Sequence, residues 1–530
     1  MFSLYLLLQY ATLHGLALVD NDHVSPPQIR QVPSIVQTTS GVVQGHFATW
    51  PVQNSVVEFL GIPYAQPPLG ALRFQAPQAL AANASSNKIE ASNFSQDCLQ
   101  YTGTGGGGSQ TPLASPQLRA YGFGMGGGSA DAPHSYGEDC LTVNVWSKAE
   151  GAVGRAVMVW IYGGGFSTGT SNAPFYSGAR LAQDEDVVVV SFNYRINIFG
   201  FPNAPGLQDQ NIALLDQRLA VEWVRDNAAA FGGDPDRITL FGESAGAASV
   251  DLYSYAWTQD PIVNGFIAQS GSASLASRPA VNTTFWFAVS ASLGCGGEEA
   301  GNSTVECMRT KDATDVINTV GEITNGSISS GFGPAADEKL VFSDVQNRSA
   351  SGNFVKKPLL IGSNDFELGL ARALPGSLGF GGLPPNASDE VLQTATELAF
   401  GCGAGKAASD RMANGVPAWR YRYMAVWNNT ALTNTTGAYH SSEIPIALGT
   451  NALRPNSTAD TEEEAALTKS MVHAWAEFAK DPVGGLTDLG WPQYSPNGTT
   501  LIRLGYQNQS ALNIGPSTQY DAPCGASLPG

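Results

Sequence analysis

The chain has 530 residues, of which 43% are hydrophobic and 14% are charged, a balance that argues against a coiled coil or a disordered protein and for one or two large folded cores. Its 27 basic and 45 acidic residues give a formal net charge of −18, which repels nucleic-acid backbones and anionic lipid headgroups. We therefore expect no nucleic-acid partner.

The chain begins with an apolar stretch over residues 3–19 that is typical of a secretory signal peptide. Gly-Leu-Ala at residues 15–17 supplies a small-x-small cleavage site, which predicts a signal peptide over residues 1–17. Since no Lys or Arg precedes the apolar stretch, a buried N-terminal strand or helix is the alternative. No other run approaches the roughly 20 apolar residues of a membrane span, so we expect a soluble mature protein without stable membrane insertion.

Cysteines and glycosylation sequons favour the secretory route. The six cysteines are even in number, well separated and free of metal-ligand spacing, which favours three disulfides over a zinc site. They are Cys98, Cys140, Cys295, Cys307, Cys402 and Cys524. Twelve Asn-x-Ser/Thr sequons predict glycosylated surface loops, provided that the chain meets the glycosylation machinery. They begin at Asn83, Asn93, Asn282, Asn302, Asn325, Asn347, Asn386, Asn428, Asn434, Asn456, Asn497 and Asn508.

Residues 103–128 form a glycine-rich segment of low complexity between Cys98 and Cys140. The composition favours a flexible surface insertion, and a loop that overhangs the mouth of an active site is the alternative.

The central part of the chain alternates predicted strands with predicted helices. Continuous apolar runs, typical of strands buried on both faces, begin the series. The predicted strands lie at residues 156–161, 187–192, 237–241 and 358–361. Apolar residues at helical spacing predict a crossover helix between residues 207 and 231 and an amphipathic helix over residues 465–480. This alternation predicts an α/β protein with a central mixed sheet.

Residues 242–246 read Gly-Glu-Ser-Ala-Gly and lie between a predicted strand and a predicted helix at residues 247–253. A strand, a sharp Gly-x-Ser-x-Gly turn and a helix form a nucleophile elbow, in which one hydroxyl stands above the sheet. Ser244 is therefore the candidate nucleophile for acyl transfer. Ser167 also lies in a Gly-x-Ser-x-Gly sequence, but a loop rather than a helix follows it, so context favours Ser244.

A serine nucleophile needs a general base, and the base needs an acid to hold its tautomer. In α/β-hydrolases the serine comes first, then the acid, then the histidine, and only His440 and His473 follow the elbow. His473 lies within the amphipathic helix, beside Met471 and Trp475, where we expect a packed structural histidine. His440 lies in a loop, where catalytic residues are commoner, and we predict that it is the base.

The acid should come from the segment between the elbow and His440. Gly-Ser-Asn-Asp-Phe-Glu follows the predicted strand that ends at residue 361, at a place where a carboxylate would emerge from the rim of the sheet. Asp365 and Glu367 both qualify chemically, and the residue pattern leaves the choice open.

The glycine run at residues 163–165 follows the predicted strand 156–161 and can offer backbone N–H groups to an oxyanion. Ala245, directly after the candidate nucleophile, can offer another, and the loss of one such donor costs about 3–4 kcal/mol of barrier. A phosphate-binding loop is the alternative, but no Lys-Ser/Thr follows and the spacing is not that of a dinucleotide fingerprint. We therefore predict an oxyanion hole.

Together these motifs resemble the type-B carboxylesterases, the cholinesterase and fungal lipase branch of the α/β-hydrolase fold. The matching segments cover nearly all of the mature chain, at residues 59–65, 67–70, 72–74, 138–144, 162–166, 193–195, 215–217, 231–235, 242–246 and 269–271. The resemblance implies a single α/β-hydrolase domain over residues 18–530, with a large, mixed, mostly parallel central sheet flanked by helices.

The resemblance also implies a role for individual residues. The family's acid lies five residues after the glycine of a Gly-x-Asn segment, and its base lies in a Gly-x-x-His-x-x-Glu pattern. These positions imply a triad of Ser244, Glu367 and His440, with Gly164, Gly165 and Ala245 as oxyanion donors. The implied disulfides are Cys98–Cys140, Cys295–Cys307 and Cys402–Cys524, and the implied ion pairs are Arg73–Glu138 and Arg195–Asp216. Neither a metal nor a cofactor is implied.

Two departures from the family bear on the substrate. Cholinesterases hold a quaternary ammonium with a Trp between their first two cysteines, and residues 99–139 contain none, so choline esters are not expected. Family lipases use the same loop as an amphipathic lid, for which residues 103–128 are too rich in glycine.

We expect a secreted hydrolase that cleaves a small-molecule carboxylic ester through an acyl-enzyme. The alternatives are a lipase or sterol esterase on long acyl chains, a biosynthetic esterase of a secondary metabolite, and a non-catalytic adhesion member of the fold. Adhesion members usually lack a triad residue, and none is missing here. The sequence leaves the physiological ester and the oligomeric state open.

Overall fold

The computed structural model describes residues 29–81, 86–101, 135–276, 280–324, 331–374, 386–453 and 458–525. The predicted signal peptide, the glycine-rich residues 103–128 and the sequons at Asn83, Asn325 and Asn456 lie outside these ranges.

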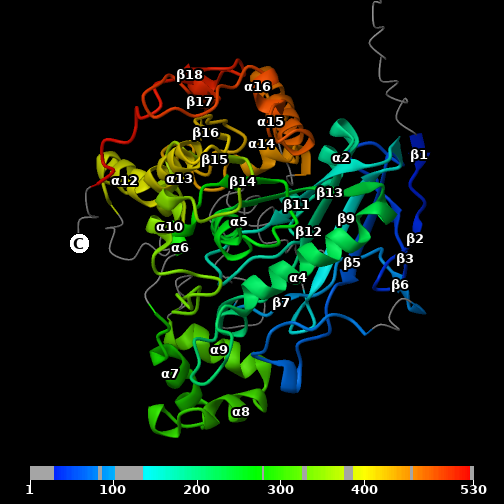
Figure 1. The fold of residues 1–530 in the computed structure, drawn as a ribbon, viewed down its shortest axis with the longest axis vertical. Helices are drawn as coiled ribbons and strands as arrows, with labels where there is room; N and C mark the ends of the chain where they lie inside the picture. The colour runs from blue at the N-terminus through cyan, green and yellow to red at the C-terminus, as the bar shows by residue number, and fades with distance from the viewer. Residues whose placement is uncertain are drawn as a thin grey trace, which may run out of the picture.

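An 11-stranded mixed sheet runs through the molecule and confirms the predicted α/β-hydrolase fold class (Figure 1). In sheet order its strands are β18 (Ile514–Gly515), β17 (Leu501–Leu504), β16 (Ala418–Tyr423), β15 (Leu359–Asn364), β14 (Gly265–Gln269), β13 (Gly233–Glu243), β11 (Arg155–Ile161), β12 (Val188–Phe192), β9 (Thr142–Lys148), β5 (Val56–Pro63) and β4 (His46–Phe47). All pairings from β17 across to β12 are parallel. The antiparallel pairings lie at the two edges of the sheet.

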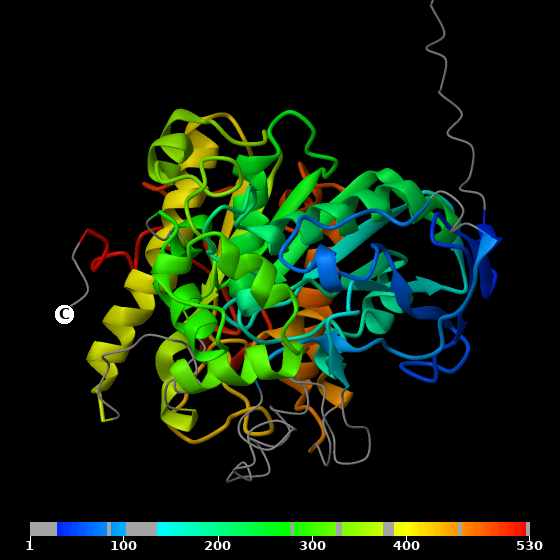
Figure 2. The ribbon, with the colours of Figure 1, turned by 90° about the horizontal axis from the view of Figure 1, so that it is seen from below.

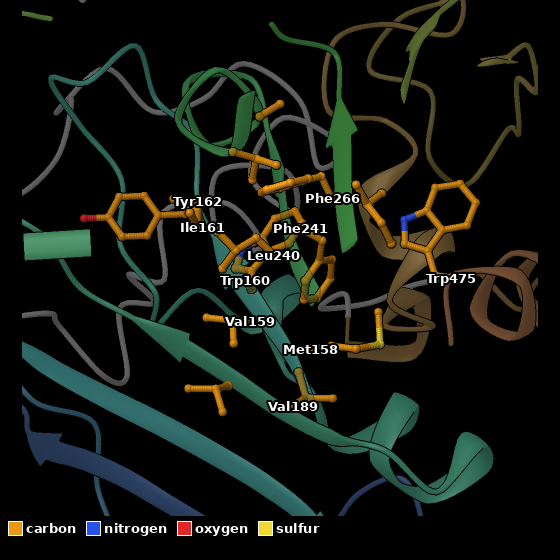
Figure 3. Packing of buried hydrophobic residues seen from close by; sticks show 14 of the residues in the cluster. Met158, Val159, Trp160, Ile161, Tyr162, Val189, Leu240, Phe241, Phe266 and Trp475 are labelled. Atoms are coloured by element: carbon orange, nitrogen blue, oxygen red, sulfur yellow. The ribbon is translucent and has the colours of Figure 1, made fainter. Parts of the chain in front are cut away.

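The centre of the sheet is buried on both faces. Every residue of β11 and β12 is buried, as the continuous apolar runs predict. In Figure 3 the side chains of Met158 and Trp160 on β11 lie among residues of the neighbouring strands, with Trp475 from a covering helix near them.

Two layers of helices cover the sheet. The main covering helices are α2 (Ala179–Glu185), α4 (Ile212–Asn227), α5 (Ala245–Ala256), α13 (Cys402–Ala413) and α15 (Glu462–Lys480). Tyr253 of α5 packs on Phe266 of β14, whereas Trp475 of α15 donates a hydrogen bond to Gln269 of the same strand. Because side chains alternate along a strand, α5 and α15 cover opposite faces. Helices α4 and α13 bind α5 through side chains, and α2 binds α15 in the same way.

The remaining elements are short. The helices are α3 (Asn197–Gly200), α6 (Ala273–Ala276), α7 (Thr284–Ser292), α8 (Ser303–Arg309), α9 (Ala313–Ile323), α10 (Val345–Ser351), α11 (Leu370–Ala373), α12 (Asp389–Thr396), α14 (Ile444–Ala447) and α16 (Gly485–Asp488). The strands outside the large sheet are β1 (Ile29–Gln31), β2 (Ile35–Gln37), β3 (Val42–Gln44), β6 (Lys88–Glu90), β7 (Asp97–Cys98), β8 (Tyr136–Gly137) and β10 (Glu150–Ala152). Figure 2 shows the N-terminal strands at one end of the molecule and the C-terminal elements toward the other.

The implied covalent and ionic links are present. The three disulfides are Cys98–Cys140, Cys295–Cys307 and Cys402–Cys524. Arg195 and Asp216 form a buried pair with N–O distances of 2.6 and 2.8 Å, and Arg73 binds both carboxylate oxygens of Glu138 at 2.6 Å. Within the described ranges, no helix combines the length and the apolar character needed to cross a membrane.

Candidate active site

Ser244 lies at a sharp turn between β13 and α5. Its backbone has φ 57° and ψ −121°, a conformation that L-residues rarely adopt, and its side chain is partly exposed between buried neighbours. A Cβ on Gly246 would lie 2.0 Å from the carbonyl oxygen of Ile161, and one on Gly242 would lie 2.6 Å from that oxygen. Only glycine therefore fits on either side of the serine, as a nucleophile elbow requires.

Ser167 occupies a different environment. It lies in a tight turn in which the N–H groups of Ser167 and Thr168 both donate to the carbonyl of Gly164. Its side chain is buried, and no helix begins directly after it. The structure thus shows the strand-turn-helix context only at Ser244.

His440 and Glu367 form a buried pair at the edge of the sheet where β15 and β16 end. His440 Nδ1 lies 2.7 Å from Glu367 Oε2, and both side chains are less than 5% exposed. The N–H of Asn364 donates to the other carboxylate oxygen, Oε1, at 2.6 Å, which fixes the acid in place. Asp365, the other candidate acid, instead accepts from Arg422 at 2.6 Å.

The second nitrogen of His440 points toward the elbow. His440 Nε2 lies 3.1 Å from Oε1 of Glu243, the residue before Ser244, and the same oxygen accepts from Ser441 Oγ at 2.7 Å. The Ser244 hydroxyl makes no hydrogen bond to another described residue. The structure therefore brings the candidate acid and the candidate base into contact, and the candidate nucleophile follows directly in sequence after Glu243, which faces His440 Nε2.

Electrostatics at the histidine are dominated by carboxylates. Burial lowers the pKa of His440, but the charges of Glu243 and Glu367 outweigh burial and raise the pKa of His440 to about 9. Burial raises the pKa of Glu243 to about 8. These carboxylates therefore stabilise the protonated form of the imidazole.

The glycine loop after β11 packs directly on the elbow. Gly164 and Gly165 have φ of 110° and 62°, and a Cβ on Gly163 would lie 2.8 Å from Ser244 Cβ. Neither the Gly164 nor the Gly165 N–H donates a hydrogen bond to another described residue. Ala245 is the first residue of α5, so its N–H has no acceptor within the helix. These three N–H groups are therefore available as donors to an oxyanion at Ser244.

Comparison with known proteins identifies the family. A sequence profile of the carboxylesterase family matches residues 32–375 and 383–521. The chain belongs to the carboxylesterase family. This carboxylesterase is 35% identical over 460 residues to a chlorogenic acid esterase of Aspergillus niger, across 85% of this chain and 83% of that protein. It is also 35% identical over 527 residues to secreted lipase 5 of Gibberella zeae, across 89% of this chain and 90% of that protein.

A third relative aligns with a smaller part of this chain. The chain is 37% identical over 355 residues to a cholinesterase of Mus musculus, across 65% of this chain and 55% of that protein. The family and these relatives establish a serine carboxylic ester hydrolase that acts on small-molecule esters. The three disulfides favour an oxidising compartment.

Sequence reasoning assigned no role to two buried residues near His440. Glu443 accepts from Asn364 Nδ2 at 2.6 Å and from Gln269 Nε2 at 3.1 Å, and burial raises the pKa of Glu443. Phe400, from a π-helical turn at Glu397–Gly401, packs on the His440 ring with 5.0 Å between centroids. Glu443 falls within the quoted Gly-x-x-His-x-x-Glu pattern, but no local pattern in the sequence indicates Phe400.

His473 was expected to be a packed structural histidine, but the structure shows it only partly buried. Its side chain is 45% exposed, and its Nδ1 lies 2.9 Å from Glu185 Oε2. Glu185, His473 and Glu477 are the one trio in the described ranges that brings potential metal ligands together. Lys480 Nζ lies 3.2 Å from Glu185 and 2.8 Å from Glu477, so a cation already occupies the position between the two carboxylates.

Proposed function

We propose that Ser244, His440 and Glu367 are the catalytic triad of a secreted carboxylic-ester hydrolase that works through an acyl-enzyme. The buried contact of 2.7 Å between His440 and Glu367, at the edge of the sheet where the elbow lies, is the observation that carries the proposal. An acid that binds Nδ1 leaves Nε2 free to take a proton from a nucleophile.

In this mechanism the Ser244 oxygen attacks the ester carbonyl while His440 Nε2 takes its proton. The hydrogen bond between serine and histidine forms in the substrate complex, where catalytic hydrogen bonds commonly tighten. Glu367 holds the tautomer and stabilises the imidazolium. The N–H groups of Gly164, Gly165 and Ala245 bind the oxyanion, and His440 then returns the proton to the departing alcohol.

The second half of the reaction releases the acid. Water, activated by His440, attacks the acyl-enzyme, and the tetrahedral intermediate collapses to free Ser244 and a carboxylic acid. The residues in these roles supply the nucleophile, the general base and the hydrogen-bond donors for the oxyanion. The proposed mechanism therefore uses no metal and no cofactor.

The proposal has two versions, which differ in the ester that the enzyme cleaves. A general esterase on short esters is the primary version, and a relative named chlorogenic acid esterase extends it to esters of phenolic acids. The relative named as a secreted lipase supports a long-chain version. A panel of p-nitrophenyl esters from about two to sixteen carbons, with chlorogenic acid beside it, separates these versions.

Secretion is part of the proposal, with a signal peptide over residues 1–17 and one catalytic domain over residues 18–530. All sequon asparagines in the described ranges are exposed, as glycan attachment requires. They are Asn93, Asn282, Asn302, Asn347, Asn386, Asn428, Asn434, Asn497 and Asn508. N-terminal sequencing of protein from the culture medium, with the mass change on deglycosylation, tests this part.

The proposal is tested by Ser244→Ala, with Ser167→Ala as the matched control from the second Gly-x-Ser-x-Gly sequence. We expect Ser244→Ala to lose about 10⁶-fold in kcat while it remains folded, and Ser167→Ala to keep its turnover. An organophosphate should add one phosphoryl group, found on Ser244 by peptide mapping. Full activity of Ser244→Ala, or a phosphoryl group on Ser167, would contradict the proposed nucleophile.

A further inference from the structure

The side chain of Gln100 binds both backbone groups of Gly169. Gln100 Oε1 accepts from the Gly169 N–H at 3.0 Å, and Gln100 Nε2 donates to the Gly169 carbonyl at 3.0 Å. The same Nε2 also donates to the carbonyl of Cys98 at 3.2 Å. One amide side chain thus fixes the position and the orientation of the backbone at Gly169, 69 residues away in sequence.

A second side chain joins the same two segments. Asn197 Nδ2 donates to the carbonyl of Leu99 at 2.9 Å and to that of Ser167 at 3.4 Å. The N–H of Asn197 donates to the carbonyl of Phe166 at 2.7 Å. The segment at residues 98–100 is therefore attached twice to the loop at residues 163–169, which carries the proposed oxyanion donors.

A displacement at Gly169 reaches those donors through direct packing. A Cβ on Gly169 would lie 2.5 Å from the carbonyl oxygen of Gly163, so the two ends of the loop are in contact. A Cβ on Gly163 would lie 2.8 Å from Ser244 Cβ. Because these backbones touch, the position of Gly169 sets the position of the intervening N–H groups relative to the serine.

The segment that carries Gln100 is itself firmly held. Cys98 forms a disulfide with Cys140, two residues before β9 of the central sheet. Asp97 Oδ1, which is buried, accepts from Thr170 Oγ1 at 2.5 Å and from Asn172 Nδ2 at 2.7 Å. Gln100 is thus a link between the sheet and the loop rather than a free surface residue.

We propose that Gln100 is a positioning residue for ester hydrolysis, which acts through Gly169 to aim the N–H groups of Gly164 and Gly165 at the oxyanion. This inference rests on the proposed function. Oxyanion donors work only within about 2.7–3.1 Å of the developing charge, and a misplacement of about 1 Å can cost roughly 100-fold in rate. A link that holds this loop should therefore affect kcat rather than substrate binding.

The chain provides a matched control in Gln210. Its amide makes the same kind of contact with Ala204, accepting from the N–H at 3.0 Å and donating to the carbonyl at 2.7 Å, with a third bond to Leu207 at 3.2 Å. Gln210→Ala removes an equivalent clamp without touching the oxyanion loop. Any general effect of losing three such hydrogen bonds is thereby measured separately.

The experiment compares Gln100→Met, Gln100→Glu and Gln210→Ala on a short p-nitrophenyl ester. We expect Gln100→Met, which fills the space without the hydrogen bonds, to lower kcat about 10- to 100-fold with KM nearly unchanged. Gln100→Glu keeps an acceptor for the Gly169 N–H and should fall between Gln100→Met and the unchanged protein. Gln210→Ala should keep its kcat.

The inhibition constant of a tetrahedral inhibitor distinguishes a positioning role from a purely structural role, which would leave this constant unchanged. A trifluoromethyl ketone adds to the serine and places its oxyanion on the Gly164 and Gly165 N–H groups, so its inhibition constant should weaken in Gln100→Met by about the factor lost in kcat. A folded Gln100→Met with unchanged kcat and inhibition constant would overturn the inference. So would failure of Gln100→Glu to fold, because Gln100 would then be a folding determinant. Failure of the proposed function is seen separately, as an inactive unchanged protein.

Discussion

His440 Nε2 lies 3.1 Å from Oε1 of Glu243, so the imidazole of the proposed base lies between two carboxylates rather than beside one. Glu367 binds Nδ1 and Glu243 faces Nε2, and both side chains are buried. In the proposed mechanism, negative charge on either side stabilises the imidazolium that forms when His440 takes a proton from Ser244. The same arrangement keeps the free histidine protonated to a higher pH than usual.

Glu243→Gln should shift the pH dependence of kcat/KM. The charge of Glu243 raises the pKa of His440, and His440 must be neutral to act as the base, so kcat/KM should rise as pH increases toward about 9. Removing that charge lowers the pKa of His440, and the rising limb should move to lower pH by about one to three units. Glu58→Gln, which removes a carboxylate 2.9 Å from the partly exposed His46, is the control and should leave the profile unchanged.

Glu367→Gln and Asp365→Asn should separate the two candidate acids. Glu367→Gln leaves Nδ1 without its carboxylate and favours the wrong tautomer, so kcat should fall about 10⁴-fold. Asp365 faces Arg422, which Glu397 also binds at 2.6 Å, so Asp365→Asn should keep kcat within about threefold. Steady-state kinetics on one ester decide the matter, and the reverse order of effects would assign the acid role to Asp365.

Gly164→Ala should abolish most turnover through the oxyanion loop. A Cβ there would lie 2.3 Å from the carbonyl oxygen of Thr168, so the loop must move, and kcat should fall about 100-fold or more. Gly154→Ala is the control, because Gly154 also has positive φ, 76°, but has open space around its Cβ position. That control should lose only about 1–2 kcal/mol of folding stability. Equal kinetic effects would show that backbone strain, not the loop's position, explains the loss.

Asp216→Asn should destabilise the fold far more than Asp184→Asn. Asp216 is fully buried and binds both the side chain and the N–H of Arg195, so its replacement leaves a buried charge without a partner and should cost about 3–5 kcal/mol. Asp184 pairs with Arg180 on the surface of α2, and its loss should cost less than about 1 kcal/mol. Urea unfolding measures both, and similar midpoints would contradict the distinction.

Local patterns predicted the elbow well, because strand, turn and helix are contiguous in the sequence. The predicted strand at residues 237–241 became the longer β13, and the helix predicted from residue 247 begins at Ala245. The choice between Asp365 and Glu367 was different, because both lie on one short segment after β15. Only the family resemblance favoured Glu367, and the structure places it at the imidazole.

Contacts between residues far apart in the sequence could not be predicted from local sequence patterns. Gln269 and Glu443 are 174 positions apart, and their contact depends on the order of strands in the sheet. His473 is less buried than predicted, for a reason visible in the helical period. It lies two residues from both Met471 and Trp475, which is about half a turn around the helix, so their burial places His473 on the solvent side.

Three buried acidic groups surround the His440 imidazole, namely Glu243, Glu367 and Glu443. This arrangement costs folding stability. Raised pKa values at Glu243 and Glu443 mean that ionising these groups opposes folding, since the unfolded chain ionises at lower pH. Neutral residues at Glu243 and Glu443 would therefore remove a cost to folding stability that grows as pH rises. Around this imidazole, buried carboxylates stand where stability alone would favour neutral side chains.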